Sequence, residues 1–352
     1  MKQTLKYWWA CLLCHSRLVE LFIWLRDILS GNQHTVILMF HRVVPRASQD
    51  RIYSLSEIVV YQDTFDSQML FLSENYHLMS LNDFVNASKK RQKIPSKTAV
   101  ITFDDGWEDN YLYAFPVLKK YKLPATIFLT TGFIGTDRAY WQENILFLTE
   151  RLSSSQDILK NCFCLNNLSG FDTLIEGLAS GTNINALRLA LISRLTQVDE
   201  GAVTGLIDSL KAAAGNPEFP SRENAHLTWQ QVSEMKNAAI NFGSHGVNHR
   251  LLDMCAEGLL REELRLSKQM LEDKLERPAV NFAYPNGNYT EHVIGLLSEC
   301  GYVSGVTVKE GLNTSASDLY RLKRINICEG RFLNPRGQFS VERFATRLAG
   351  LL

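Results

Sequence analysis

The sequence predicts an α/β fold, a distorted (β/α) barrel of about seven parallel strands with a helical insertion and an N-terminal amphipathic helix. Two observations lead to this prediction. Seven short runs rich in β-branched residues recur along the chain, and each is followed by a stretch with helical spacing. Continuous apolar strands that alternate with helices are typical of a parallel sheet covered on its outer side, and seven such units favour a barrel or a partly closed one.

The predicted elements follow a regular order until the third strand. The predicted strands are residues 34–40, 98–103, 125–131, 239–244, 279–284, 303–308 and 321–327. After the third strand, residues 141–229 show helical patterns such as "NALRLALISRL" and few strand signals. We therefore expect a barrel domain of residues 34–335 with a helical insertion at residues 141–229, and a C-terminal helix over residues 336–352.

Residues 1–33 predict an amphipathic, tryptophan-rich helical segment. A membrane-spanning helix needs about 20 largely apolar residues, whereas five charged residues divide this segment. They are Lys6, Arg17, Glu20, Arg26 and Asp27. The stretch "HSRLVELF" offers no small-residue cleavage site for a signal peptidase. The segment could lie in a membrane surface or dock on its own domain, and we expect a bacterial cytoplasmic or peripheral membrane location rather than secretion.

The composition is that of a globular protein without net charge. Of 352 residues, 45% are hydrophobic, which is enough for a sizeable core. Because 37 Lys and Arg residues balance 37 Asp and Glu residues, the long-range attraction of a general nucleic-acid binder is absent, and no nucleic-acid partner is expected. Seven scattered cysteines indicate mostly reduced thiols. Residues 11–15 match the C-x-x-C-H haem-attachment pattern, but an apolar helix is the favoured interpretation.

Side chains suited to metal binding follow the predicted strands. His41 ends the first strand, Asp104 and Asp105 end the second, and His245 and His249 follow the fourth. In a parallel β/α fold the carboxyl ends of the strands meet at one face. Two histidines four residues apart, with Asp105 from another strand end, suit a divalent metal, with Zn²⁺ expected and Fe, Mn, Co or Ni as alternatives. A single histidine would be explained as structural, but the trio favours a metal site.

The adjacent aspartates also need an explanation, because neighbouring like charges repel. A cation bound by Asp105 would remove much of this repulsion and leave Asp104 free to accept a proton from water as a general base. Gly106 would allow the sharp turn that brings both side chains into one pocket. The alternative is a pair of solvated loop acids, one of which caps the next helix.

Three short motifs carry a resemblance to a known family. They are "TFDDGW" at residues 102–107, "SHGVNH" at residues 244–249 and "AYPNGNY" at residues 283–289. They resemble the first three motifs of the polysaccharide deacetylases, the NodB-homology domain of carbohydrate esterase family four. The resemblance covers most of residues 36–327 apart from the helical insertion.

The resemblance implies a distorted (β/α) barrel with a divalent metal, usually zinc. It also implies hydrolysis of the N-acetyl group of an amino sugar in a polysaccharide or oligosaccharide, with release of acetate. By position, Asp104 matches the catalytic base of the family, and Asp105, His245 and His249 match its metal ligands. Asn286 takes the place whose backbone N–H helps to hold the oxyanion, a role that any main-chain donor can fill.

This sequence departs from the family pattern at three places. Ala283 replaces the arginine that tethers the catalytic aspartate, Arg324 replaces the histidine that serves as general acid, and the Asp-x-x-Asp-Trp motif is missing. Arg324 could reach Asp104 as a substitute tether. His41 could protonate the leaving amine, although a buried histidine that anchors a loop is an equal alternative.

Two aromatic residues could contact a sugar, and two other functions are alternatives to a deacetylase. Tyr284 and Trp107 could stack on sugar rings, although aromatic residues at strand ends are also ordinary core. One alternative function is a catalytically impaired glycan-binding protein on the same fold. Another is a non-haem iron oxygenase, but the order of its ligands and its usual double-sheet fold are not found in this sequence.

Overall fold

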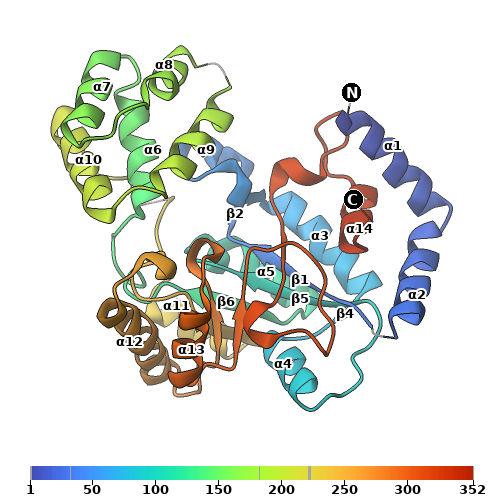
Figure 1. Ribbon diagram of the computed structural model, residues 1–352. Coiled ribbons are helices and arrows are strands. Elements are labelled where there is room, and N and C mark those ends of the chain that lie inside the picture. Colours follow the sequence, from blue (N-terminus) through green and yellow to red (C-terminus); the bar gives the residue numbers. More distant parts are fainter. Residues whose placement is uncertain (1, 32, 182, 221–222, 352) are drawn as a thin grey trace. The chain divides into compact units, whose positions relative to one another are not determined.

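The computed structural model describes residues 2–31, 33–181, 183–220 and 223–351, and the chain forms two compact units (Figure 1). The barrel unit comprises Met1–Ala47, Glu57–Thr136 and His226–Leu352. The helical unit comprises Ser48–Ser56 and Asp137–Ala225.

The barrel unit is built on a curled sheet in which every neighbouring pair of strands is parallel. The strand order is β10-β1-β5-β6-β7-β8-β9, and β4 pairs with Thr98 and Ala99, the first two residues of β5. The strands are β1 (Thr35–Phe40), β4 (His77–Leu78), β5 (Thr98–Phe103), β6 (Ala125–Leu129), β7 (Ile240–Ser244), β8 (Asn281–Ala283), β9 (Ser304–Val306) and β10 (Ile325–Asn326). An isolated parallel bridge joins Val306 of β9 to Leu322, which lies three residues before β10. The predicted distorted barrel is confirmed, and each predicted strand segment contains one of its strands.

Helices cover the sheet and bury its apolar side chains (Figure 1). They are α3 (Gln62–Asn75), α4 (Leu81–Lys89), α5 (Phe115–Tyr121), α11 (Trp229–Lys236), α12 (Glu257–Leu275), α13 (Glu291–Glu299) and α14 (Val341–Leu348). The six residues of β1 and of β5 are all buried, as expected for strands covered on both faces. Two short strands that the sequence did not predict, β2 (Arg42–Val44) and β3 (Val59–Tyr61), form a separate parallel pair.

The register of β1 and β5 brings two functional residues together. The strands pair residue by residue, from Thr35 opposite Thr98 to Phe40 opposite Phe103. The next residues along the chain, His41 and Asp104, therefore leave the sheet side by side at its carboxyl end.

The N-terminal segment forms two helices instead of one. They are α1 (Lys2–His15) and α2 (Leu18–Ser30), which meet at an angle of 78°. Arg17 lies at the break in a left-handed conformation with φ of 56°. Buried Val19 and Ile23 pack with Ala349, which follows α14, so one side of the pair docks on the barrel unit. In Figure 1 α1 runs beside α14.

The helical unit has a core of its own. It contains α6 (Trp141–Arg151), α7 (Gln156–Leu165), α8 (Asp172–Ser180), α9 (Ile184–Leu195) and α10 (Glu200–Ala213). Buried Ile145, Phe163 and Leu206 belong to one apolar cluster that these helices share. The distant segment Ser48–Ser56 joins this unit, where Tyr53 packs edge-on against Phe147 with ring centroids 5.1 Å apart.

Candidate active site and metal centre

A sharp turn after β5 presents the two adjacent aspartates. The backbone N–H of Asp104 donates to the carbonyl oxygen of Phe40 at 3.0 Å, so Asp104 still continues the sheet. Asp105 and Gly106 then adopt φ of 76° and 80°. A Cβ atom at Gly106 would lie 2.8 Å from Leu129 Cδ2, so both the backbone conformation and the available space require glycine.

Asp105, His245 and His249 come together at this turn. Oδ1 of Asp105 lies 3.4 Å from Nε2 of His245 and 3.5 Å from Nε2 of His249. Nδ1–H of His245 donates to the carbonyl oxygen of Ala283 at 2.8 Å, which orients the ring so that Nε2 faces Asp105. All three ligand atoms lie within 4.8 Å of one another. This one-carboxylate, two-imidazole set can hold a divalent metal and leave positions open for water and substrate.

The surroundings set the charges of these three groups. Burial acts to lower the pKa of His245, but the hydrogen bond to Asp105 and the charge of Asp104 outweigh it and raise the pKa, so a metal would displace a proton from this imidazole. Burial favours a raised pKa for the Asp105 carboxyl, but the hydrogen bond to His245 and the neighbouring histidines outweigh it and hold the pKa well below its usual range. Burial, together with the charge of His245, lowers the pKa of His249 to about 4. Asp105 is therefore ionised and His249 neutral at pH 7.

Arg324 holds Asp104 in a buried, two-pronged ion pair. Nη1 and Nη2 of Arg324 each donate to one oxygen of the Asp104 carboxylate at 2.7 Å. Nε of the fully buried Arg324 donates to the carbonyl oxygen of Thr307 at 2.9 Å, which fixes the guanidinium plane. Burial acts to raise the pKa of Asp104, but the charges of Arg324 and His245 outweigh it and the pKa lies below its usual value. Arg324 thus lies where the sequence hypothesis placed a substitute tether.

His41 lies on the other side of the same carboxylate. Its Nε2 is 3.9 Å from Oδ2 of Asp104, and its side chain is 14% exposed. Burial lowers the pKa of His41, although the charges of Asp105 and Asp104 act in the opposite direction. The imidazole is therefore neutral at pH 7, and it must take up a proton before it can act as an acid.

Trp107 and Tyr284 do not lie on a sugar-binding surface, so that prediction is wrong. Trp107 is 1% exposed, and its Nε1–H donates to Oδ2 of Asp105 at 3.0 Å. Its ring stacks on His226 with centroids 4.7 Å apart. Tyr284 is fully buried and donates its hydroxyl to the carbonyl oxygen of Tyr320 at 2.9 Å. Packing, the alternative that the sequence left open, describes both residues, and Trp107 also orients Asp105, a candidate metal ligand.

Glu263 is a supporting residue that the sequence did not reveal. It lies on α12 with 2% of its surface exposed. Its Oε2 accepts the backbone N–H groups of Val247 and Asn248 at 2.7 and 3.0 Å, and its Oε1 accepts the Asn248 side-chain amide at 2.9 Å. Glu263 therefore fixes the loop that joins His245 and His249. A glutamate on a distant helix carries no local signal for such a role.

Asp109 and Asn110 anchor the segment that carries His41. Oδ2 of Asp109 accepts from Nε of Arg42 at 2.8 Å, and Oδ1 accepts the backbone N–H of Val43 at 3.0 Å. Nδ2 of Asn110 donates to the carbonyl oxygen of His41 at 2.7 Å. Burial raises the pKa of Asp109 in spite of Arg42. The residues after the aspartate pair thus tie the end of β5 to the end of β1.

Asn286, the predicted oxyanion donor, lies in the exposed loop after β8 with φ of 55°. Its Nδ2 donates to Oδ1 of Asn288 at 3.3 Å. The preceding strand ends in Ala283, whose carbonyl oxygen orients His245. Asn286 therefore lies three residues after the end of β8, the strand whose last residue orients His245.

The model of the family described as polysaccharide deacetylase matches residues 91–161 and 205–305. These residues include both aspartates and both histidines of the site. The chain belongs to the polysaccharide deacetylase family. The resemblance stated from the three motifs is thereby confirmed.

Individual relatives agree with this assignment. The Bacillus subtilis protein YxkH, assigned to the polysaccharide deacetylases, is 22% identical over 295 residues, which cover 84% of this chain and 71% of that protein. The poly-β-1,6-N-acetyl-D-glucosamine N-deacetylase of Staphylococcus aureus is 42% identical over 79 residues, which are 22% of this chain and 27% of that enzyme. The chain thus matches only about a quarter of the length of the staphylococcal enzyme.

A solved structure shares the fold. The Streptococcus pyogenes deacetylase PplD in complex with acetate superposes with a TM-score of 0.55 at 23% identity, covering 87% of this chain and 96% of that one. At this identity the likeness supports the barrel architecture alone.

Proposed function

We propose that the protein is a metal-dependent hydrolase that removes N-acetyl groups from amino sugars of a bacterial polysaccharide or its precursor and releases acetate. As a polysaccharide deacetylase it is an enzyme of the class that hydrolyses carbon–nitrogen bonds other than peptide bonds. One arrangement carries the proposal. Asp105 forms a metal-donor set with two histidines, while the adjacent Asp104 is held by Arg324 and not by the donor set.

The donor set fits a divalent metal on its own chemistry. Asp105 is ionised, and because Nδ1–H of His245 is donated to Ala283, Nε2 is the atom that would lose its proton and present a lone pair to a metal. We propose Zn²⁺, with Fe, Mn, Co or Ni as alternatives. A metal bound there would lower the pKa of water and polarise the acetyl carbonyl group.

The side chains around the donor set can move the protons of an amide hydrolysis. Each oxygen of Asp104 keeps a lone pair beyond the one that Arg324 occupies, so the carboxylate can still accept a proton from the attacking water. His41, on the other side of Asp104, would take up this proton from Asp104 and pass it to the amine as the C–N bond breaks. The backbone N–H of Asn286 would stabilise the negative charge on the former carbonyl oxygen. The products are acetate and a free amino sugar.

A catalytically impaired glycan-binding protein is the second candidate. The lowered pKa of His41 favours it, because a neutral imidazole cannot donate a proton directly. The position of Arg324 counts against it, because the tether that Ala283 cannot provide is supplied by the residue directly before β10. A module that only binds glycans has no use for a base beside a metal site.

The proposal is tested by measuring bound metal and released acetate on the same protein samples. We expect the purified wild type to release acetate from N-acetylated oligosaccharides in proportion to its metal content. Asp104→Asn should keep the metal and lose at least about 100-fold in turnover, because a general base contributes about 10²–10⁴. Asp208→Asn, the same substitution at an exposed position of α10, is the matched control. Full activity of Asp104→Asn would exclude the proposed base, and oligosaccharide binding without acetate release by the wild type would favour the second candidate.

A further inference from the structure

The N-terminal helix pair carries an exposed apolar stripe. Of the large apolar side chains that are exposed among the described residues, ten lie on α1 and α2 and eight on all other segments together. The ten are Leu5, Trp8, Trp9, Leu12, Leu18, Leu21, Trp24, Leu25, Ile28 and Leu29. Their spacing places most of them on one side of each helix. An exposed apolar surface of this kind marks an interaction site.

The opposite side of the same helices is already packed. Ala10, Val19 and Ile23 are buried, and the thiol of Cys14 donates to the carbonyl oxygen of Glu342 on α14 at 3.7 Å. Docking on the protein's own domain therefore accounts for this inner side only. The apolar stripe faces away from it.

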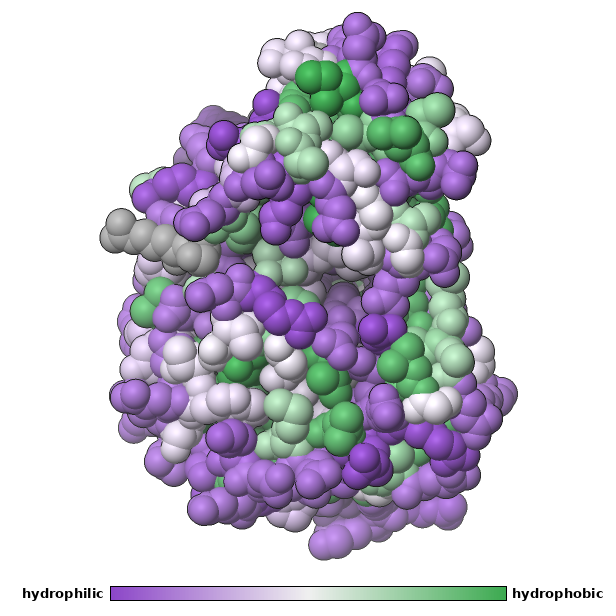
Figure 2. Space-filling view, turned by 90° about the vertical axis from the view of Figure 1, so that its left-hand side faces the viewer, coloured by the Kyte–Doolittle hydropathy of each residue, from purple (hydrophilic) through white to green (hydrophobic). Residues whose placement is uncertain are grey.

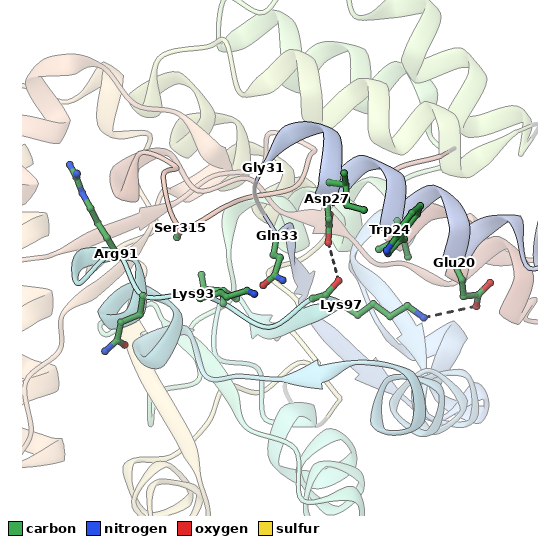
Figure 3. A pocket seen from close by; sticks show the side chains of 14 residues that line it. Glu20, Trp24, Asp27, Gly31, Gln33, Arg91, Lys93, Lys97 and Ser315 are labelled. Carbon is green, nitrogen blue, oxygen red and sulfur yellow. Dashed lines mark hydrogen bonds and ion pairs between the residues drawn. The ribbon is translucent and has the colours of Figure 1, made fainter.

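A basic segment, residues 89–93 with the sequence "KKRQK", lies next to the apolar stripe. Its four charged residues, Lys89, Lys90, Arg91 and Lys93, are exposed, and within the described part of the chain none of them has an ion pair. A pocket of about 790 Å³ is lined by Trp24 and Ile28 of α2 and by Arg91 and Lys93 of the basic segment (Figure 3). The apolar stripe and unpaired positive charge thus border the same pocket.

The acidic groups of α2 do not cancel this charge. In Figure 3 the Lys97 side chain points to Glu20, with Nζ and Oε1 4.0 Å apart. Asp27 is engaged by Arg26 at 3.1 Å and by His34 at 3.0 Å. Both acids therefore have basic partners outside residues 89–93.

The pocket and the candidate active site lie at opposite ends of the strands. Gln33 and Lys97, which line the pocket, lie two residues before β1 and one residue before β5. His41 and Asp104 directly follow the same two strands. Figure 2 shows the side turned away from α1 and α2, where apolar residues occur in small groups between hydrophilic ones.

The shape of the helix pair favours lying in a membrane surface. No single described helix is long and apolar enough to cross a bilayer, and the pair Thr4–His15 and Leu18–Ser30 meets that requirement only together, with a bend of 78°. Tryptophan side chains on an apolar stripe, with basic residues beside them, are typical of helices that rest at the level of the lipid headgroups.

We propose that α1 and α2 bind the surface of a bilayer that contains anionic lipid, with the apolar stripe among the acyl chains and residues 89–93 on the lipid phosphates. A second copy of this chain could cover the apolar stripe, but it would bring a second basic segment with it. Anionic lipid complements both features. Bound in this way, the protein keeps the carboxyl ends of its strands directed away from the bilayer.

The test is co-sedimentation of the full chain with vesicles of phosphatidylcholine alone and of phosphatidylcholine mixed with phosphatidylglycerol. We expect binding to the mixed vesicles that weakens with added salt. The triple substitution Lys89→Glu, Lys90→Glu and Lys93→Glu should weaken binding at least about tenfold, since each basic residue near an anionic surface contributes about fivefold. Trp8→Ser combined with Trp24→Ser should have a similar effect on both kinds of vesicle.

Matched substitutions elsewhere on the chain serve as controls. Lys119→Glu, Lys211→Glu and Lys323→Glu change the net charge equally at exposed positions of the described chain, and Leu165→Ser with Met254→Ser removes equally exposed apolar groups. These variants should bind as the wild type does, and circular dichroism should show that all variants are folded. Equal losses in test and control variants, or no wild-type binding to the mixed vesicles, would overturn the proposal. A wild-type dimer in light scattering that Trp8→Ser with Trp24→Ser converts to monomer, without vesicle binding, would identify a second copy as the occupant.

Discussion

The two adjacent aspartates have different surroundings although they are neighbours in the chain. Asp105 faces two imidazoles, and Asp104 faces one guanidinium. The positive φ of Asp105 turns the chain between them, so that the two carboxylates need not compete for one cation. Each carboxylate is stabilised in its ionised form by different neighbours, Asp105 by imidazoles and Asp104 by a guanidinium. Two adjacent carboxylates that would otherwise repel each other can therefore both stay ionised.

Removal of Arg324 should be costly because it leaves Asp104 buried and unpaired. We expect Arg324→Met to lower the free energy of unfolding by about 3 kcal/mol and to lower turnover, while bound metal stays near one equivalent per chain. Urea unfolding and metal analysis measure the two effects.

A double substitution separates charge from packing at this pair. Arg324→Met combined with Asp104→Asn should recover part of the lost stability, since no unpaired charge remains, but it should recover no activity. If the double variant is as unstable as the sum of the single variants, the ion pair is not the source of the effect.

Trp107 should tune the metal site through a single hydrogen bond. Trp107→Phe keeps the ring that stacks on His226 but loses the Nε1–H that donates to Asp105. We expect metal affinity to fall about 10- to 100-fold, as measured by competition with a metal-binding dye. Trp229→Phe, the same substitution on α11, should leave the affinity unchanged, and equal loss in both variants would contradict this role.

At the scale of single residues, the sequence shows which residue types follow the strands, but not the direction in which every side chain points. The strand ends alone mark Asp105, His245 and His249 as a possible donor set, because parallel strands share one carboxyl edge. Whether a side chain at such an end points to solvent or into the core depends on neighbours from other strands. For this reason Trp107 and Tyr284 could not be distinguished from surface aromatics.

At the scale of elements, the site depends on two loops that are fixed from outside. Asp109 and Asn110 hold the segment after β1, and Glu263 of α12 holds the loop after β7. Each uses buried polar groups to satisfy backbone N–H or carbonyl groups that leave the sheet without ladder partners. The rigidity of the metal ligands therefore comes from residues that do not touch the metal site.

Glu263 should affect metal binding through the position of its loop. Glu263→Ala leaves the N–H groups of Val247 and Asn248 in a partly buried loop without their acceptor, and we expect metal affinity to fall at least about tenfold. Glu263→Gln keeps one carbonyl oxygen for these donors and should restore most of the affinity. Calorimetric zinc titration of both variants measures the difference, and equal affinities for Ala and Gln would rule out the hydrogen-bonding role.

The sequence predicted seven strands of the main sheet and missed β2, β3 and β4. The buried runs that form β1, β5, β6 and β7 span five or six residues and are recognisable from composition. The strands β2, β3 and β4 have two or three residues, too few to show a periodicity. The strands β8, β9 and β10 are as short, but they lie within the longer predicted segments 279–284, 303–308 and 321–327. The break between α1 and α2 was missed because it depends on a left-handed arginine, a residue that gives no turn signal.

At the scale of the whole molecule, the candidate site and the helical insertion belong to different units. All residues of the candidate site belong to the barrel unit, whereas the helical unit has its own apolar core. The change in the spacing of apolar residues predicts a helical insertion at residues 141–229, and the helical unit of the structure includes Asp137–Ala225. No sequence pattern indicated that Ser48–Ser56 would join the same unit, because contacts between distant segments leave no local pattern.

Metal binding should stabilise the barrel unit as a whole, since the donors come from two different strand ends. A ligand that binds only the folded state adds about 2.7 kcal/mol when its free concentration is 100 times Kd. We expect the free energy of unfolding, followed by tryptophan fluorescence in urea, to rise by about this amount with zinc relative to chelator. His249→Ala should abolish the increase, and an equal increase in this variant would place the stabilising metal elsewhere.

The most direct test of the division of labour between the two aspartates is anomalous X-ray diffraction at the zinc edge from crystals grown with zinc. We predict one strong peak at about 2.0–2.2 Å from a carboxylate oxygen of Asp105 and from Nε2 of His245 and His249. The carboxylate of Asp104 should remain on Arg324, outside bonding distance of the peak. A peak bonded to Asp104, or no peak between Asp105 and the histidines, would contradict the account.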